Sequence, residues 1–201
     1  MAQADDLEQV LEKSRALALE QVDDENERLL RGAVRRFPEN AEVWLRLGLA
    51  VLLSTPEESA TYLRRAVSLA PTDPWTLTRA ASIMFFLHEF DAAQDYVDRA
   101  VRAAPDQFEG EIDLMHLRGR LAFRAGDLAV AEDLLAAAFT AEPEGIRHGQ
   151  VLADLYIEQG RLKEALSVLA AALECRRDDE HLHRLRRKVL SRLARPENAG
   201  S

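Results

Sequence analysis

The 201-residue chain is poor in cysteine, in aromatic residues and in positive charge, and each shortage excludes a class of protein. Its single cysteine, Cys175, can form neither an internal disulfide nor a cysteine-based zinc site. Aromatic residues make up only 6% of the chain, and 35 acidic residues against 26 lysines and arginines give a formal net charge of -9. That charge disfavours binding to nucleic acid or to an anionic membrane by bulk electrostatic attraction.

Long apolar runs are also lacking. No stretch approaches the roughly 18 uninterrupted apolar residues that span a bilayer. The first residues, 1–6, have neither the basic start nor the apolar segment of a signal peptide. We therefore expect a cytoplasmic protein with no membrane partner, and the frequent alanine and arginine favour a bacterial source.

Hydrophobic residues (47%) and charged residues (30%) are abundant, and alanine and leucine dominate. This composition is typical of an all-helical protein, because both residues have high helix propensity. A chain of this length forms one domain or at most two.

A repeat with a period of about 34 residues runs along the chain. Four alanines each stand five residues before a proline, and these pairs are Ala33 and Pro38, Ala66 and Pro71, Ala100 and Pro105, and Ala138 and Pro143. Two further series of mostly small residues share the period, namely Ser14, Gly48, Ala81, Gly119 and Ala153, and Asn26, Ser59, Ala93, Ala131 and Ala165. Small side chains let two helices approach closely where they cross, and proline ends a helix. Each repeat is therefore predicted to be a helix-turn-helix unit.

The segment Trp44-x-x-Leu47-Gly48, followed by Ala66 and Pro71, resembles the tetratricopeptide repeat (TPR), whose pattern is W-x2-L-G-x2-Y, then A-x3-F, then P. This resemblance implies an all-α fold, a right-handed α-solenoid of about five TPR-like helix-turn-helix repeats with a C-terminal capping helix. We expect a single solenoid over residues 1–195 and a disordered tail over residues 196–201. The expected repeats span about 4–38, 41–71, 74–105, 108–143 and 146–176, and the capping helix spans about 179–195.

Two irregularities interrupt the repeats. In the second repeat the turn is one residue shorter and reads Thr55-Pro56-Glu57-Glu58, which predicts a capping box with proline at the first helical position. The interval from Pro105 to Gly119 is four residues longer than the equivalent interval from Pro71 to Ala81, which is about one helical turn. These additional residues predict either an extended first helix or a loop containing Phe108 and Gly110.

No constellation of catalytic residues is found. The chain contains no P-loop, GxGxxG, HExxH or GxSxG string, and His181 and His183, two residues apart on a predicted helix, make a poor metal site. We therefore expect a protein that is not an enzyme and that has no cofactor or metal.

If TPR geometry holds, the first helix of each pair lines a concave groove. The resemblance then places an apolar half and a polar half in the groove, and the candidate partner-binding residues are Leu45, Leu49, Leu53, Trp75, Arg79, Phe86, His116, Arg120, Arg124, Arg147 and Asp154. Spacing alone leaves open which of them are groove and which are core. Exposed aromatic and arginine side chains are the residue types that dominate binding energy at interfaces.

The expected function is that of a non-catalytic scaffold or adaptor that binds a peptide segment or helix of a partner protein in this groove. Two alternatives are open. One is a structural TPR protein that self-associates, for example as a homodimer. The other is an accessory or sensor subunit that binds a small molecule or a signalling peptide.

Overall fold

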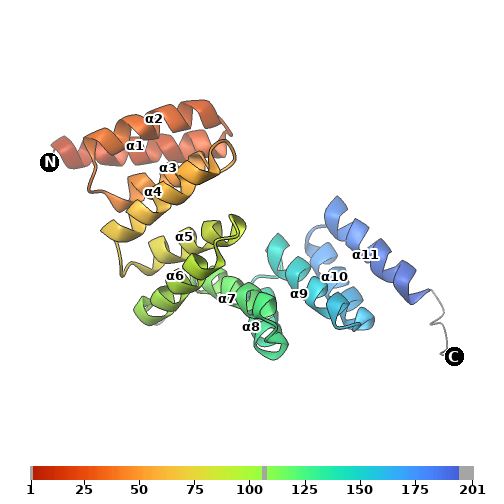
Figure 1. Cartoon of the computed structure of the whole chain (residues 1–201). Helices are drawn as coiled ribbons and strands as arrows, with labels where there is room; N and C mark the ends of the chain where they lie inside the picture. The colour runs from red at the N-terminus through yellow and green to blue at the C-terminus, as the bar shows by residue number, and fades with distance from the viewer. Residues whose placement is uncertain (1, 106–107, 195–201) are drawn as a thin grey trace. The chain divides into compact units, whose positions relative to one another are not determined.

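The computed structural model describes residues 2–105 and 108–194, and among these the side chains of all except residues 2–4 and 146. The described residues form eleven α-helices and no strand (Figure 1). The expected disordered tail, residues 196–201, lies outside the described residues. The helices are α1 (Ala2–Leu19), α2 (Asp23–Arg36), α3 (Ala41–Ala50), α4 (Pro56–Leu69), α5 (Pro74–Phe86), α6 (Phe90–Ala103), α7 (Glu111–Ala125), α8 (Leu128–Ala141), α9 (Ile146–Glu158), α10 (Leu162–Cys175) and α11 (Glu180–Leu193).

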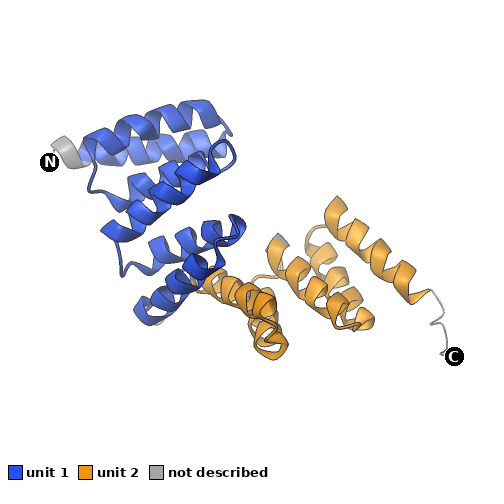
Figure 2. Ribbon diagram, in the orientation of Figure 1, with its two compact units in different colours: residues 1–110 blue, residues 111–201 orange. Residues whose placement is uncertain are grey.

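The chain divides into two compact units, residues 1–110 and residues 111–201 (Figure 2). Unit 1 holds three helix pairs, α1 with α2, α3 with α4, and α5 with α6. Unit 2 holds two pairs, α7 with α8 and α9 with α10, and α11 packs on α10. The predicted all-α fold of helix-turn-helix repeats with a C-terminal capping helix is confirmed.

Small residues lie where the two helices of a pair cross. A side chain at Gly48 of α3 would start 2.9 Å from Leu63 Cγ of α4, and one at Gly119 of α7 would start 2.7 Å from Leu135 Cγ of α8. Both distances are shorter than a carbon–carbon contact allows, so each crossing requires glycine. The Ser59 hydroxyl also donates to the Gly48 carbonyl at 2.7 Å, which joins α4 to α3.

Four of the five turns within helix pairs share one conformation. A residue with positive φ follows the first helix, and the next N–H donates to a carbonyl five residues earlier, which satisfies a free carbonyl at the helix end. The residues with positive φ are Gln21, His88, Gly126 and Gly160.

The shorter turn of the second repeat differs from the prediction. Pro56 begins α4 as expected, but the predicted capping box is wrong, because the Thr55 side chain makes no capping hydrogen bond. Glu58, which would complete the box, instead accepts from Arg31 Nη2 at 2.7 Å and from the Tyr62 hydroxyl at 2.9 Å.

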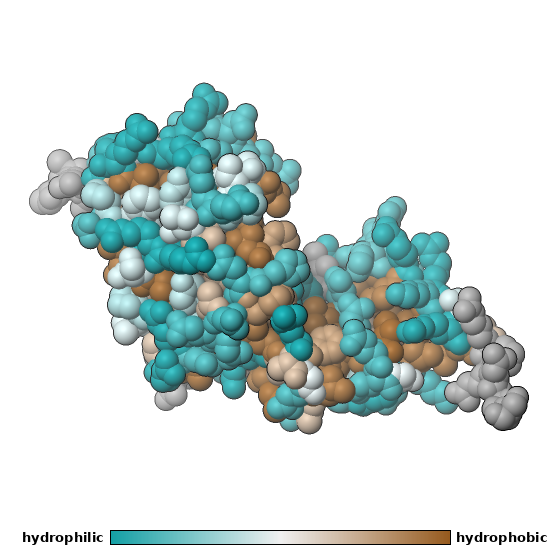
Figure 3. Space-filling model, viewed as in Figure 1, coloured by the Kyte–Doolittle hydropathy of each residue, from teal (hydrophilic) through white to brown (hydrophobic). Residues whose placement is uncertain are grey.

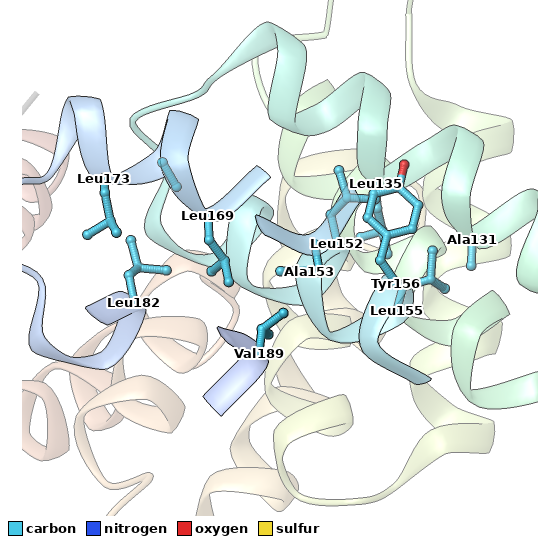
Figure 4. Packing of buried hydrophobic residues seen from close by; sticks show 12 residues of the cluster. Ala131, Leu135, Leu152, Ala153, Leu155, Tyr156, Leu169, Leu173, Leu182 and Val189 are labelled. Carbon is cyan, nitrogen blue, oxygen red and sulfur yellow. The ribbon is translucent and has the colours of Figure 1, made fainter. Parts of the chain in front are cut away.

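Each unit has its own hydrophobic core. In unit 1, Leu30, Val43, Leu47 and Val51 are buried together with residues of α1. In unit 2 the core extends from α8 to α11, where Leu182 and Val189 of α11 are fully buried against α9 and α10 (Figure 4). The apolar face of α11 therefore closes this core while its arginines stay outside.

Candidate partner-binding groove

Unit 1 contains a groove of about 810 Å³ between its first helices. Its wall consists of the C-terminal half of α1, the start of α2, the length of α3 and the start of α5. Five of the predicted residues, Leu45, Leu49, Leu53, Trp75 and Arg79, line it. The first helices of unit 1 thus bring these side chains together on one surface.

These lining residues differ in exposure. Leu45 is 2% exposed and belongs to the floor, and Leu49 is half-buried. Leu53 is 86% exposed and Trp75 is 40% exposed. A large apolar side chain in water contributes little to the fold and is available for contact.

The Trp75 ring contacts Arg79 and Phe108. The Arg79 guanidinium lies 5.7 Å from the centre of its ring, at cation–π distance. The ring of Phe108 meets it edge-on, with centroids 6.1 Å apart and an interplanar angle of 82°. Gly110 permits this contact, because a Cβ there would lie 2.6 Å from Phe108 Cζ and 3.0 Å from Trp75 Cζ3.

Phe108 and Gly110 come from the insertion after Pro105, for which the sequence left a longer helix or a loop open. The loop is present, since residues 108–110 are non-helical and α7 begins at Glu111. The contact of this loop with Trp75 was not predicted, because no sequence pattern links two positions so far apart.

Three exposed apolar residues of unit 1 share one repeat position, with Leu19 at the end of α1, Leu53 in the turn after α3 and Phe86 at the end of α5. Each stands five residues after the small residue of its repeat, and they are 79%, 86% and 58% exposed. Leu19 and Leu53 line the groove, whereas Phe86 occupies the same position at the end of α5. On the face drawn in Figure 3, hydrophobic side chains interrupt the hydrophilic surface near this end of α5 and over α8.

The charges of the groove are partly neutralised within it. Arg46 Nε is 2.5 Å from Glu42 Oε1, and its Nη1 donates to the Leu11 carbonyl at 2.8 Å. Asp23 and Asp24, in the first turn of α2, also line the groove. These two carboxylates were not predicted, because only first helices were expected to line the groove, although their position four and five residues after Leu19 was a usable signal.

Among the predicted residues of unit 2, His116 is buried. His116 is 6% exposed and meets His148 edge-on, with ring centroids 4.6 Å apart. Neither ring nitrogen of His116 has a hydrogen-bond partner among the described residues. Burial, reinforced by His148, Arg120 and Arg147, lowers the pKa of His116 to about 3.

The other four predicted residues of unit 2 are more exposed. Burial lowers the pKa of half-buried Arg120, and the charge of exposed Arg147 adds to this effect. Burial raises the pKa of half-buried Asp154, against the opposing influence of His181 and Lys188. Arg124 is exposed at the end of α7.

Within the described part of the chain, no three His, Cys, Asp or Glu side chains gather as a metal site requires. Across the same residues, no helix is both long and apolar enough to cross a membrane. The groove itself is lined by exposed apolar side chains, a tryptophan and several charged side chains.

Comparison with known families identifies the family of the chain. Two models, each described as tetratricopeptide repeat, match residues 24–74 and 122–189. The chain belongs to the tetratricopeptide repeat family. TPR proteins are generally non-catalytic scaffolds. No curated protein matches this TPR chain.

Solved structures of other TPR proteins share its fold. Pseudomonas aeruginosa PilF is 11% identical with a TM-score of 0.79, and the match covers 96% of this chain and 86% of that chain. A thermophilic TPR protein of Thermus thermophilus is 22% identical with a TM-score of 0.75, covering 92% and 99%. A chain of the APC/C hetero-tetramer Cut9-Hcn1 is 17% identical with a TM-score of 0.77; the match covers 88% of this chain and only 35% of that chain.

Proposed function

We propose that this TPR chain is a non-catalytic scaffold or adaptor and that the groove of unit 1 binds a segment of a partner protein. The observation that carries the proposal is the exposure of Leu19, Leu53 and Trp75 along one groove. Tryptophan is among the residues that dominate the energy of protein interfaces, and exposed apolar side chains contribute when a partner excludes water from them. The lone, exposed thiol of Cys175 suits a reducing compartment, which supports action in the cytoplasm.

Within this proposal the predicted residues have different roles. Leu53, Trp75 and Arg79 contact the partner, and Leu49 shapes the groove beside them. Leu45 supports the groove from the core. Arg124 and Arg147, which are exposed on unit 2, are further candidates for a contact with the partner.

The test is photo-crosslinking from within the groove. A benzoylphenylalanine at position 53 is placed in the protein, crosslinked in a lysate of the native host, and the attached peptide is sequenced by mass spectrometry. We expect one partner segment, and we expect its yield to fall in a Leu19→Ala variant. A matched probe at position 130 of α8, where Val130 is 44% exposed, should not capture that segment.

Two outcomes would overturn the adaptor function. A crosslink to a second copy of this chain would show self-association through the groove. A segment captured equally well from position 53 and position 130 would show that the groove is not the interface. Leu19 is 79% exposed, so its truncation should leave the melting temperature within about 1 °C and keep the comparison free of unfolding.

A further inference from the structure

The start of α9, in unit 2, is a helix N-terminus that no negative group of its own compensates. Its N-cap residue, Gly145, makes no side-chain hydrogen bond, and its first turn contains no acidic residue. Every other helix in the described part of the chain has a side-chain cap or an acidic residue in its first turn. Because the free N–H groups and the dipole of a helix N-terminus favour negative charge, this helix end can accept an anion.

Two arginines add positive charge near this helix end. Arg147 is exposed in the first turn of α9, and half-buried Arg120 lies on α7. Besides burial, the charge of Arg147 lowers the pKa of Arg120. Besides burial and His148, the charges of both arginines lower the pKa of His116. The two guanidinium groups and the two histidines are therefore close enough to interact.

Two buried histidines complete this cluster. His116 of α7 and His148 of α9 are 6% and 5% exposed, and their rings meet edge-on with centroids 4.6 Å apart. A Cβ at Gly145 would lie 2.8 Å from His148 Nε2, so the glycine leaves room for this ring beside the helix end. The same nitrogen is 3.1 Å from Glu142 Oε2. Both ring nitrogens of His116 and Nδ1 of His148 have no hydrogen-bond partner among the described residues.

These three nitrogens require both a hydrogen-bond donor and an acceptor. An ionised carboxylate only accepts, so Nε2 of His148 carries the hydrogen toward Glu142 and Nδ1 is left as an acceptor. A neutral His116 ring has one N–H donor and one acceptor nitrogen. A phosphate group can keep a P–OH donor beside its ionised oxygens near neutral pH, because its second pKa is about 6. An ionised carboxylate or a sulfate ion offers acceptors only, so the histidines favour phosphate.

We propose that the start of α9 binds a small phosphate ligand. The free N–H groups of the helix and the guanidinium groups of Arg147 and Arg120 bind its ionised oxygens. The rings of His116 and His148 supply the remaining hydrogen bonds. Their nitrogens are buried, so the ligand reaches them when the flexible arginine side chains near them move. All these residues belong to unit 2, and the inference does not depend on the proposed function of the unit 1 groove.

The test follows the histidine ring signals of the full chain by NMR, in a phosphate-free buffer at neutral pH. Inorganic phosphate, sulfate and acetate are added in separate titrations at constant ionic strength. We expect phosphate to shift the His116 and His148 signals until they saturate, with a dissociation constant of about 1 mM or less. Sulfate and acetate should bind at least about tenfold more weakly. The signal of His181, which is exposed on α11, should not distinguish the three ions.

A matched pair of arginine variants locates the bound phosphate. Arg147→Gln should weaken phosphate binding about tenfold or more, because it removes a guanidinium group from the cluster. Arg118→Gln removes the same charge from an exposed position of α7, two residues from His116 and on another side of the helix. It should change the affinity by less than about twofold, because salt screens a distant charge. Arg147 is exposed, so its replacement should leave the circular dichroism spectrum unchanged.

Three results would overturn the inference. If the His116 and His148 signals do not saturate by about 10 mM phosphate, the cluster is not a phosphate site. If sulfate and acetate produce the same shifts at the same concentrations, the cluster attracts anions without selecting phosphate. If Arg147→Gln binds phosphate as tightly as the unchanged chain, phosphate binds elsewhere. None of these results affects the groove of unit 1, which the crosslinking tests separately.

Discussion

At the scale of single residues, His116 shows how burial decides what a side chain can do. Its spacing placed it on the groove face, but the ring is 6% exposed and packs on His148. A buried imidazole without a hydrogen-bond partner among the described residues is held neutral, because the low-dielectric surroundings disfavour its charged form. It therefore acts in packing and makes the stability of unit 2 depend on pH.

The pH dependence has a definite sign. The pKa of His116 is about 3 in the folded chain and about 6.5 when unfolded, so the unfolded chain binds the additional proton between these values. Stability from this residue is present above pH 6.5 and is lost as the pH falls below it. The loss is about 2 kcal/mol at about pH 5. Urea unfolding at several pH values should show a His116→Phe variant with a correspondingly weaker pH dependence.

A second measurement checks the titration directly. In NMR spectra of the histidine rings, His116 should keep its neutral chemical shifts down to about pH 4, while exposed His181 serves as an internal comparison. A midpoint for His116 near that of a free histidine would contradict the prediction. Sequence spacing could place His116 on a helix face, but it could not show that His148, from another helix pair, covers the ring.

At the scale of helices, two glycines that both lie within helices have opposite effects on the stability of the fold. Gly48 lies at the α3–α4 crossing, and a methyl group there would be 2.9 Å from Leu63 Cγ and 3.3 Å from the Ser59 carbonyl oxygen. Gly32 lies within α2, and no described atom outside the immediate backbone is within 4 Å of its Cβ position. The first glycine is required by packing, whereas the second only weakens its helix.

Two alanine substitutions follow from this difference. Gly48→Ala should lower the free energy of unfolding by about 1–3 kcal/mol, because the crossing must open. Gly32→Ala should raise it by about 0.5–1 kcal/mol, because alanine restricts the unfolded chain and favours the helix. Circular dichroism during urea unfolding measures both. Equal effects of the two substitutions would mean that the crossing is not tightly packed.

The helices were predictable from sequence because proline and small residues mark their ends and crossings. Pro38, Pro71 and Pro143 follow second helices as expected, and Gly48 lies at a crossing. The floor and the rim of the groove were harder to predict. Both Leu45 and Leu53 lie on α3 or directly after it at groove spacing, yet one is buried and the other is 86% exposed, because exposure depends on the neighbouring helices.

At the scale of the whole molecule, each of the two compact units contains a hydrophobic core cluster. In a repeat array each element contacts mainly its neighbours in the chain, so stability is approximately a sum of local terms. A destabilising substitution in one core should therefore lower the stability of mainly its own unit.

Hydrogen exchange can test this locality. Leu169→Ala, at a fully buried position of α10, should cost about 2–5 kcal/mol. The loss of amide protection should fall on α9, α10 and α11, with α1–α4 nearly unchanged. Leu190→Ala, at a 48% exposed residue of α11, is the matched control and should change little. A uniform loss of protection over both units would contradict the local account.

The exposure of Leu19, Leu53 and Phe86 also has an evolutionary consequence. Since these side chains contribute little to the folded state, selection can replace each one without endangering the helices that carry it. A duplicated gene could thus acquire a new binding preference by a few neutral steps, one repeat at a time. The same property makes these three positions suitable for randomisation in a library of engineered binders.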